Sequence, residues 1–269
     1  MSSESHSFKP TLGLMDATMI VAGSMIGSGI FLVSADIVRN VGGAGWLIGV
    51  WLITGFMTLT AAVSYGELSG MFPKAGGQYV YLKEAYSPLT GFLYGWSFFA
   101  VIQTGTIAAV GVAFSKYAAY LIPILSEDNH ILRLQTGTNA CGDPSYFTIS
   151  AAQLASIAII GFLTYTNTRG VKGSKWIQNI FTSTKLLSLF GLIVAGFLAF
   201  RPEVWHANWN GAWQATRTSL RDICHPSLGF NITPISGAAL FGGIAAAMVG
   251  SVFSSDAWNN VTFIAGEIK

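Results

Sequence analysis

The first long apolar segment of the chain, from about Leu12 to Val33, contains a run of small residues near its centre. This run, Gly23–Phe31, includes three glycines and two serines, which are poor helix formers. Backbone that leaves a helix inside a bilayer exposes N–H and C=O groups, which is tolerated only beside a cavity or a ligand. A membrane segment that breaks at its own centre therefore predicts a site for a small polar solute.

The composition places the chain among membrane proteins. Of its 269 residues, 52% are hydrophobic and only 10% are charged, whereas a soluble domain carries about 25% charged residues. The net charge of +2 and the lack of a basic cluster exclude nucleic acid as an expected partner. No cofactor, metal ligands or catalytic residues are expected, because the four histidines have no paired spacing and no phosphate-binding loop is present.

Hydropathy predicts six membrane spans of an all-α membrane protein. The first and the sixth contain internal breaks, the sixth around Gly242-Gly243, Gly250 and Ser254–Asp256. Transporters often consist of two inverted halves whose first helices are both discontinuous. The expected domains are therefore 1–234, a first repeat with helices 1–5, and 235–269, a sixth helix that opens a second repeat of a longer protein. The predicted spans are Leu12–Val33, Gly45–Ser69, Leu89–Leu121, Phe147–Tyr165, Ile177–Phe200 and Ile235–Glu267.

The distribution of basic residues predicts a cytoplasmic N-terminus. With this orientation the cytoplasmic side receives seven Lys and Arg residues and the other side five. The two long loops, after the third and fifth spans, then lie outside. The expected location is a plasma membrane or a bacterial inner membrane.

Several ordered motifs resemble those of the amino acid–polyamine–organocation superfamily, and within it the L-type amino acid transporters. The run Gly27–Phe31 is similar to that family's first-helix motif. The segments Tyr65–Leu68 and Pro73–Tyr79 resemble its loop after the second helix. Thr184–Leu187 and Phe253–Asn259 look like its fifth and sixth helices.

The resemblance implies a LeuT-type inverted-repeat bundle with discontinuous helices 1 and 6, of which about six of twelve helices are present. It also implies sodium-independent exchange of neutral L-amino acids by alternating access. The alternatives are a proton-coupled permease, a cationic amino acid or polyamine permease, an ion channel, or an intramembrane enzyme. An enzyme would have to use Asp256 and Lys185, the only candidates inside the spans.

Both predicted breaks supply candidate substrate-binding residues. The helix that restarts after the first break presents free N–H groups and the positive end of its dipole to a carboxylate. The resemblance places Ser28 and Gly29 there, and carbonyls around Met25 opposite the substrate ammonium. Small-residue helix packing is the alternative. The predicted site residues are Met25, Ile26, Gly27, Ser28, Gly29, Phe253, Ser254, Ser255 and Asp256.

Three of these predictions carry a specific role. The resemblance makes Phe253 a gate, and Lys185 of the fifth span a substitute for a sodium ion, with snorkelling towards the headgroups as the alternative. Asp256 contacts the ammonium, favours a cationic side chain, binds a proton, or caps the second half-helix. Ser254 and Ser255 line a polar wall or bond back to their own helix.

Two further features concern a gate loop and a partner. Glu67 and Lys74 flank the loop after the second span, which is either a cytoplasmic gate loop or the site of a solvated surface pair. Cys141 and Cys224 fall in the two long loops, where a disulfide between them is an option in an oxidising compartment. In the heteromeric relatives a cysteine of the loop holding Cys141 bridges to a heavy-subunit glycoprotein. The expected partners are therefore an amino acid, the lipid bilayer and such a heavy subunit.

Overall fold

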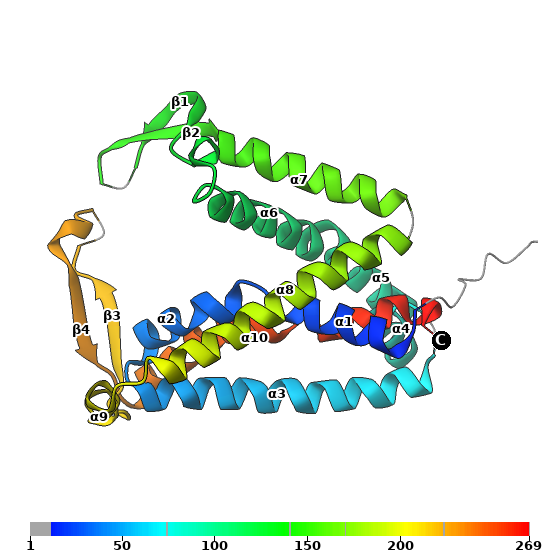
Figure 1. Ribbon diagram of the computed structural model, residues 1–269, viewed down its shortest axis with the longest axis horizontal. Helices are drawn as coiled ribbons and strands as arrows, with labels where there is room; N and C mark the ends of the chain where they lie inside the picture. The colour runs from blue at the N-terminus through cyan, green and yellow to red at the C-terminus, as the bar shows by residue number, and fades with distance from the viewer. Residues whose placement is uncertain (1–11, 74, 140, 170, 223, 269) are drawn as a thin grey trace, which may run out of the picture. The chain divides into compact units, whose positions relative to one another are not determined.

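The computed structural model describes residues 12–268 except 74, 140, 170 and 223 (Figure 1). The chain is mostly helical, as the hydropathy predicts. The α-helices are α1 (Leu14–Met25), α2 (Gly29–Val41), α3 (Ala44–Met71), α4 (Gln78–Ala85), α5 (Pro88–Ser97), α6 (Thr104–Ala118), α7 (Ala151–Thr168), α8 (Val171–Leu198), α9 (Pro202–Trp209) and α10 (Gly237–Ser255). A π-helical turn, Phe98–Gln103, joins α5 to α6, and 3-10 helices cover Pro123–Leu125, Pro226–Leu228 and Trp258–Glu267.

Five described segments are long and apolar enough to cross a bilayer. They are Leu14–Val41, Ala44–Met71, Pro88–Ala118, Trp176–Leu198 and Gly237–Ser255. They correspond to the predicted spans one, two, three, five and six, and they support an integral membrane protein.

The fourth predicted span, Phe147–Tyr165, begins too early. Its first residues belong to strand β2 (Pro144–Ser150), and α7 starts only at Ala151. At this start the Ser150 amide donates to the Gln153 side chain at 3.0 Å. The helix is shorter and more polar than the five spans and does not meet the same criteria of length and hydropathy.

Both long loops contain antiparallel hairpins that hydropathy did not predict. β1 (His130–Thr138) pairs with β2 in one loop, and β3 (Thr216–Leu220) pairs with β4 (Phe230–Pro234) in the other. In the first hairpin Arg133 lies over the ring of Tyr146, 3.8 Å from its centroid. The loops are therefore ordered structures rather than simple connections.

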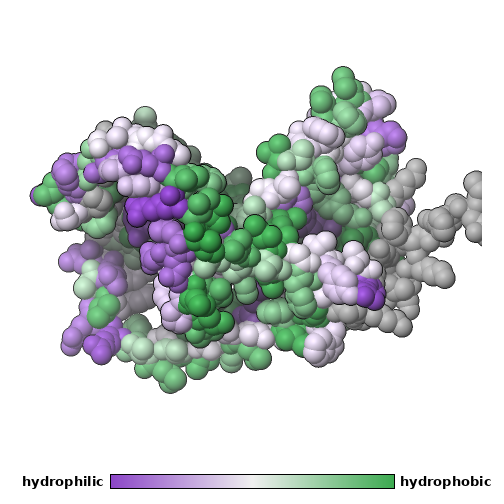
Figure 2. All heavy atoms as spheres, turned by 90° about the horizontal axis from the view of Figure 1, so that it is seen from above, coloured by the Kyte–Doolittle hydropathy of each residue, from purple (hydrophilic) through white to green (hydrophobic). Residues whose placement is uncertain are grey.

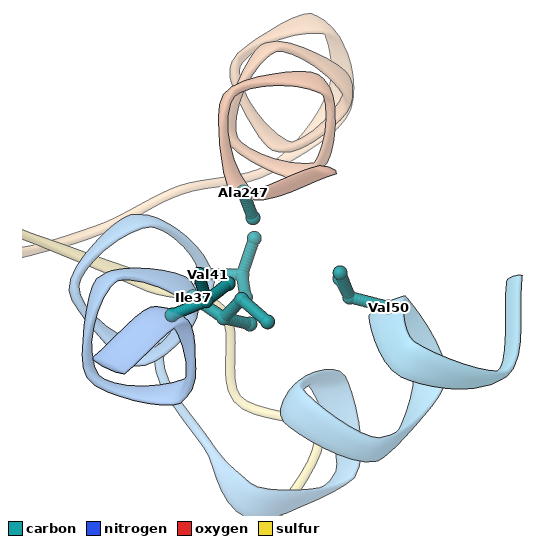
Figure 3. Packing of buried hydrophobic residues seen from close by; sticks show 5 residues of the cluster. Ile37, Val41, Val50 and Ala247 are labelled. Atoms are coloured by element: carbon teal, nitrogen blue, oxygen red, sulfur yellow. The ribbon is translucent and has the colours of Figure 1, made fainter. Parts of the chain in front are cut away.

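The chain divides into two compact units, residues 1–81 with 176–269, and residues 82–175. The core of the first unit lies between α2, α3 and α10. Val33, Ile37 and Val41 of α2 pack with Val50 of α3 and Ala247 of α10 (Figure 3). Every predicted substrate-binding residue and Lys185 belong to this unit.

The second unit is held together by α6 and α7. The buried hydroxyls of Ser115 and Ser156 hydrogen bond at 2.9 Å, and Ser156 also donates to the carbonyl of Gly111. A Cβ on Gly111 would lie 2.9 Å from Ile160, so the glycine allows the two helices to approach closely.

Large apolar side chains are widely exposed. Leu52, Phe56 and Leu59 of α3 are each more than 60% exposed, as are Phe190 and Phe197 of α8. Apolar residues cover much of the face in Figure 2. An apolar surface of this extent is unfavourable in water and suits contact with lipid.

Candidate functional site

The predicted break in the first span is present. α1 ends at Met25, residues 26–28 are not helical, and α2 begins at Gly29. The amide of Gly27 donates to the carbonyl of Met25 at 3.0 Å. This carbonyl therefore already has one hydrogen bond within the break. Among the described residues, the amides of Ser28, Gly29 and Ile30 have no backbone acceptor. These three N–H groups lie at the positive end of α2, where a carboxylate is stabilised.

The break in the sixth span lies further along than predicted. α10 continues through Phe253, Ser254 and Ser255, and the helix ends only at Asp256 and Ala257. The hydroxyls of Ser254 and Ser255 donate to the carbonyl of Ser251, at 2.9 and 2.8 Å. These bonds are the ones expected when a serine hydroxyl bonds back to its own helix. The Ser255 hydroxyl also accepts from the Thr58 hydroxyl of α3 at 3.4 Å, and the polar wall stays a prediction.

Asp256 is not the cap of a second half-helix. The residue preceding the 3-10 helix Trp258–Glu267 is Ala257, and no side chain caps that helix. The Asp256 carbonyl instead accepts the amide of Trp258. Across the described part of the chain, the Asp256 carboxylate has no hydrogen bond or ion pair. Its predicted contacts with an ammonium, a cationic side chain or a proton stay predictions.

The two breaks lie against each other. A Cβ on Gly29, the first residue of α2, would be 2.5 Å from the Cβ of Ser254, which is one turn or less from the end of α10. The start of one helix, with its free N–H groups, thus meets the end of another, whose last carbonyls are unpaired by helix geometry. Opposite partial charges therefore converge where the two helices meet.

Lys185 binds the first break from the other side. Its Nζ donates to the carbonyl of Gly23 at 3.0 Å. This carbonyl lacks its usual helical donor, because the Gly27 amide bonds to Met25 instead. The contact joins the fifth span to a first-helix carbonyl, and the role of Lys185 as a substitute for a sodium ion stays a prediction.

The neighbours of Lys185 fix α8 against α1. Thr182 is buried, and its hydroxyl lies 3.4 Å from the carbonyl of Met19. Gln178 bonds to the same hydroxyl at 3.5 Å. A Cβ on Gly23 would overlap Thr182, so glycine is required where α8 approaches the end of α1.

A family described as amino acid permease has a model that matches residues 12–269. The chain belongs to this permease family. The family and the relatives named below are transporters rather than enzymes.

Curated relatives agree with the family. The chain is 28% identical to the human large neutral amino acids transporter small subunit 2 over 261 residues, 97% of this chain and 42% of the relative. It is 25% identical to the mouse b(0,+)-type amino acid transporter 1, over 98% of this chain and 46% of the relative. It is 28% identical to the mouse Asc-type amino acid transporter 1, over 99% of this chain and 43% of the relative. The permease chain thus spans less than half the length of the curated relatives it matches.

Hydroxyl pairs that were not predicted from the sequence connect α3 to α10 in the permease. The buried Thr54 and Ser251 hydroxyls hydrogen bond at 2.7 Å, and the Thr58 hydroxyl lies 3.4 Å from that of Ser255. The pairs are four residues apart on both helices. In the sequence, the four-residue spacing of Thr54 and Thr58 places both hydroxyls on one face of α3. This spacing does not identify the helix that the hydroxyls contact.

An aromatic cluster follows the second break. Trp258 packs edge-on against Tyr65 of α3, with ring centroids 5.1 Å apart, and Tyr65 contacts Tyr81 of α4 at 5.8 Å. Burial raises the pKa of Tyr81, Tyr65 adds to this effect, and a hydrogen bond with Thr262 opposes it. The cluster connects α3 and α4, which flank the loop for which a gate was one of two predictions, to the segment after α10.

Some predicted residues are not brought into this arrangement. The Phe253 side chain is 64% exposed, and its role as a gate stays a prediction. Glu67 is exposed on α3, and Lys74 lies outside the described residues. Cys141 and Cys224 belong to the hairpin-containing loops, and both are disulfide-bonded.

Proposed function

We propose that the protein moves neutral L-amino acids across a membrane by sodium-independent exchange. The observation that carries the proposal is the meeting of two helix breaks at Gly29 and Ser254. The proposal extends to alternating access, in which the bundle of helices one, two and six moves against a scaffold of helices three to five.

The arrangement supports recognition of the groups that all amino acids share. The amides of Ser28, Gly29 and Ile30 offer donors to the carboxylate without adding a charge. Carbonyl oxygens at the ends of α1 and α10 offer acceptors to the ammonium. Because these contacts come from the backbone, they leave the choice of side chain to the surrounding pocket.

Lys185 supports sodium independence. Its ammonium is already bonded to the Gly23 carbonyl, a position where a coupling ion would otherwise neutralise the free oxygens of the break. The proposed cytoplasmic N-terminus and the division into 1–234 and 235–269 as successive repeats complete this picture.

A cationic substrate is the second candidate, favoured by Asp256. An acidic side chain inside a membrane protein is costly and is usually functional. This carboxylate has no described side-chain partner and adjoins the second break. It would attract a substrate whose own side chain carries a positive charge.

Uptake into liposomes tests the proposal. The purified protein is reconstituted, and uptake of labelled L-leucine is measured against each of the twenty amino acids, with a sodium gradient or with choline, into empty or L-leucine-loaded vesicles. We expect saturable uptake that preloading stimulates and sodium leaves unchanged. Protein-free vesicles are the control.

Three results would contradict the proposal. Uptake that needs the sodium gradient would remove sodium independence, and a conductance without saturation would indicate a channel. Competition by L-arginine in place of the neutral amino acids would favour the second candidate, and Asp256→Asn should then abolish that competition.

A further inference from the structure

Gly29 and Ser254 form a close contact between the start of α2 and the end of α10. A Cβ on Gly29 would lie 2.5 Å from the Ser254 Cβ and 3.3 Å from its Cα, and a contact below 3.0 Å does not occur between real side chains. A Cβ on Gly27, two residues earlier in the same break, would have nothing within 4 Å. Of these two glycines, only Gly29 has no room for a Cβ.

This contact is the end of a longer seam between α2 and α10. A Cβ on Gly250 would lie 3.0 Å from Val33, and one on Gly243 would lie 2.7 Å from the Asn40 carbonyl. Ala247, between these glycines, is 2% exposed and belongs to the core cluster. The seam holds α2 and α10 close together along their length. A larger residue at position 29 would therefore change the distance between the two helix ends at the breaks.

The Ser254 side chain contributes to the contact through its carbon atoms. Its hydroxyl donates to the Ser251 carbonyl at 2.9 Å, and the oxygen lies 3.7 Å from the Cβ position of Gly29, farther than the Ser254 Cβ. A direct polar contact between the Ser254 hydroxyl and a substrate would require that internal bond to break. Its steric contact with Gly29 requires no such change.

The geometry points to Ser254 as a positioning residue. Its Cβ contacts Gly29 and so sets the distance between the end of α10 and the start of α2. This distance in turn fixes the direction of the free amides of Ser28–Ile30. The inference rests on the proposed function, because it concerns the amides that would hold the substrate carboxylate. It assigns Gly29 a second requirement, that of close approach, in addition to its free amide.

A compensation experiment tests the assignment. The variants are Gly29→Ala, Gly29→Ala with Ser254→Gly, and Gly29→Ala with Ser254→Ala. Glycine at 254 removes the clashing Cβ, whereas alanine removes only the hydroxyl and keeps the Cβ. Gly242→Ala, a glycine of α10 with open space around it, controls for the addition of a methyl group.

Two quantities are measured for each variant: KM and kcat for L-leucine uptake, and the melting temperature in detergent. We expect Gly29→Ala to raise KM about tenfold, as overpacking by one methyl predicts, with a smaller change in kcat. Ser254→Gly should return KM to within about threefold of wild type and restore the melting temperature. Ser254→Ala should restore neither, and Gly242→Ala should change neither.

Other outcomes overturn the assignment. Equal rescue by Ser254→Ala would show that the hydroxyl, and not the Cβ, opposes Gly29→Ala. Recovery of the melting temperature without recovery of KM would reduce the contact to a packing role. If wild-type protein takes up no L-leucine, the proposed function fails, while the melting temperatures alone still decide whether the two Cβ positions conflict.

Discussion

A single side chain, Lys185, satisfies a backbone carbonyl that the break in the first span leaves without a donor. The Nζ of Lys185 donates to Gly23 at 3.0 Å, and the adjoining Thr182 is buried against Met19. A charge-assisted hydrogen bond of this kind contributes about 1.5–3 kcal/mol. At the residue scale, then, the shape of the break depends on a contact from a helix far away in the sequence.

Replacing Lys185 should impair transport more than it impairs folding. We expect Lys185→Met, which keeps an apolar stem, and Lys185→Ala to lower L-leucine uptake by about tenfold or more, because the Gly23 carbonyl loses its donor. Uptake by reconstituted vesicles is the measurement. Lys116→Ala, at an exposed lysine of α6, is the matched control. Unchanged uptake by both Lys185 variants would refute a role for this ammonium.

At the scale of elements, paired hydroxyls fix α3 to α10 beside the second break. Thr54 and Ser251 are completely buried and bonded at 2.7 Å, and Ser251 also reaches the Met248 carbonyl. Interhelical hydrogen bonds in membrane proteins contribute about 0.6 kcal/mol on average and up to about 1.7 kcal/mol. The pair therefore favours one register of α3 against α10 and adds modestly to stability.

A double-mutant cycle of Thr54→Val and Ser251→Ala should reveal this coupling. We expect an interaction free energy of about 0.6–1.7 kcal/mol from reversible unfolding in detergent. Thr60→Val combined with Ser251→Ala is the control, since the Thr60 hydroxyl bonds only to carbonyls of its own helix. A coupling as small as that of the control would show that the Thr54 and Ser251 hydroxyls do not stabilise the helix pair.

The sequence predicted the breaks better than it predicted their contacts. Gly27–Gly29 indicated the first interruption correctly, because glycine and serine are poor helix formers. The second lies after Ser255, since hydroxyl bonds to Ser251 allow α10 to continue past the polar residues. Apolar runs carry no signal for the hairpins, and the meeting of Gly29 with Ser254 depends on packing that no local pattern encodes.

At the scale of the whole molecule, one relative is described as the small subunit of a transporter. We propose that this chain also joins a larger subunit. Chemical cross-linking of native membranes should then give a species larger than the chain alone, and affinity capture of the tagged chain should recover the same partner. Recovery of the chain alone in both assays would contradict the proposal.

Cys141 and Cys224 are both disulfide-bonded in the structure, and we predict that they pair with each other. The chain should then migrate at its own mass without reductant, and reduction should alter only the mobility of that single band. Cys141→Ser and Cys224→Ser should each abolish this change in mobility. A larger species that only a reductant dissociates would contradict the pairing.

The positive charge at the Gly23 carbonyl is part of the protein chain, because it belongs to Lys185, and this has an energetic consequence. A positive charge that belongs to a side chain cannot dissociate into the opposite compartment with the cargo, as a bound ion can. Occupation of the Gly23 carbonyl by such a tethered charge leaves no route by which an electrochemical gradient of sodium drives accumulation through this position. The direction of net movement would then follow the concentrations of the exchanged solutes alone.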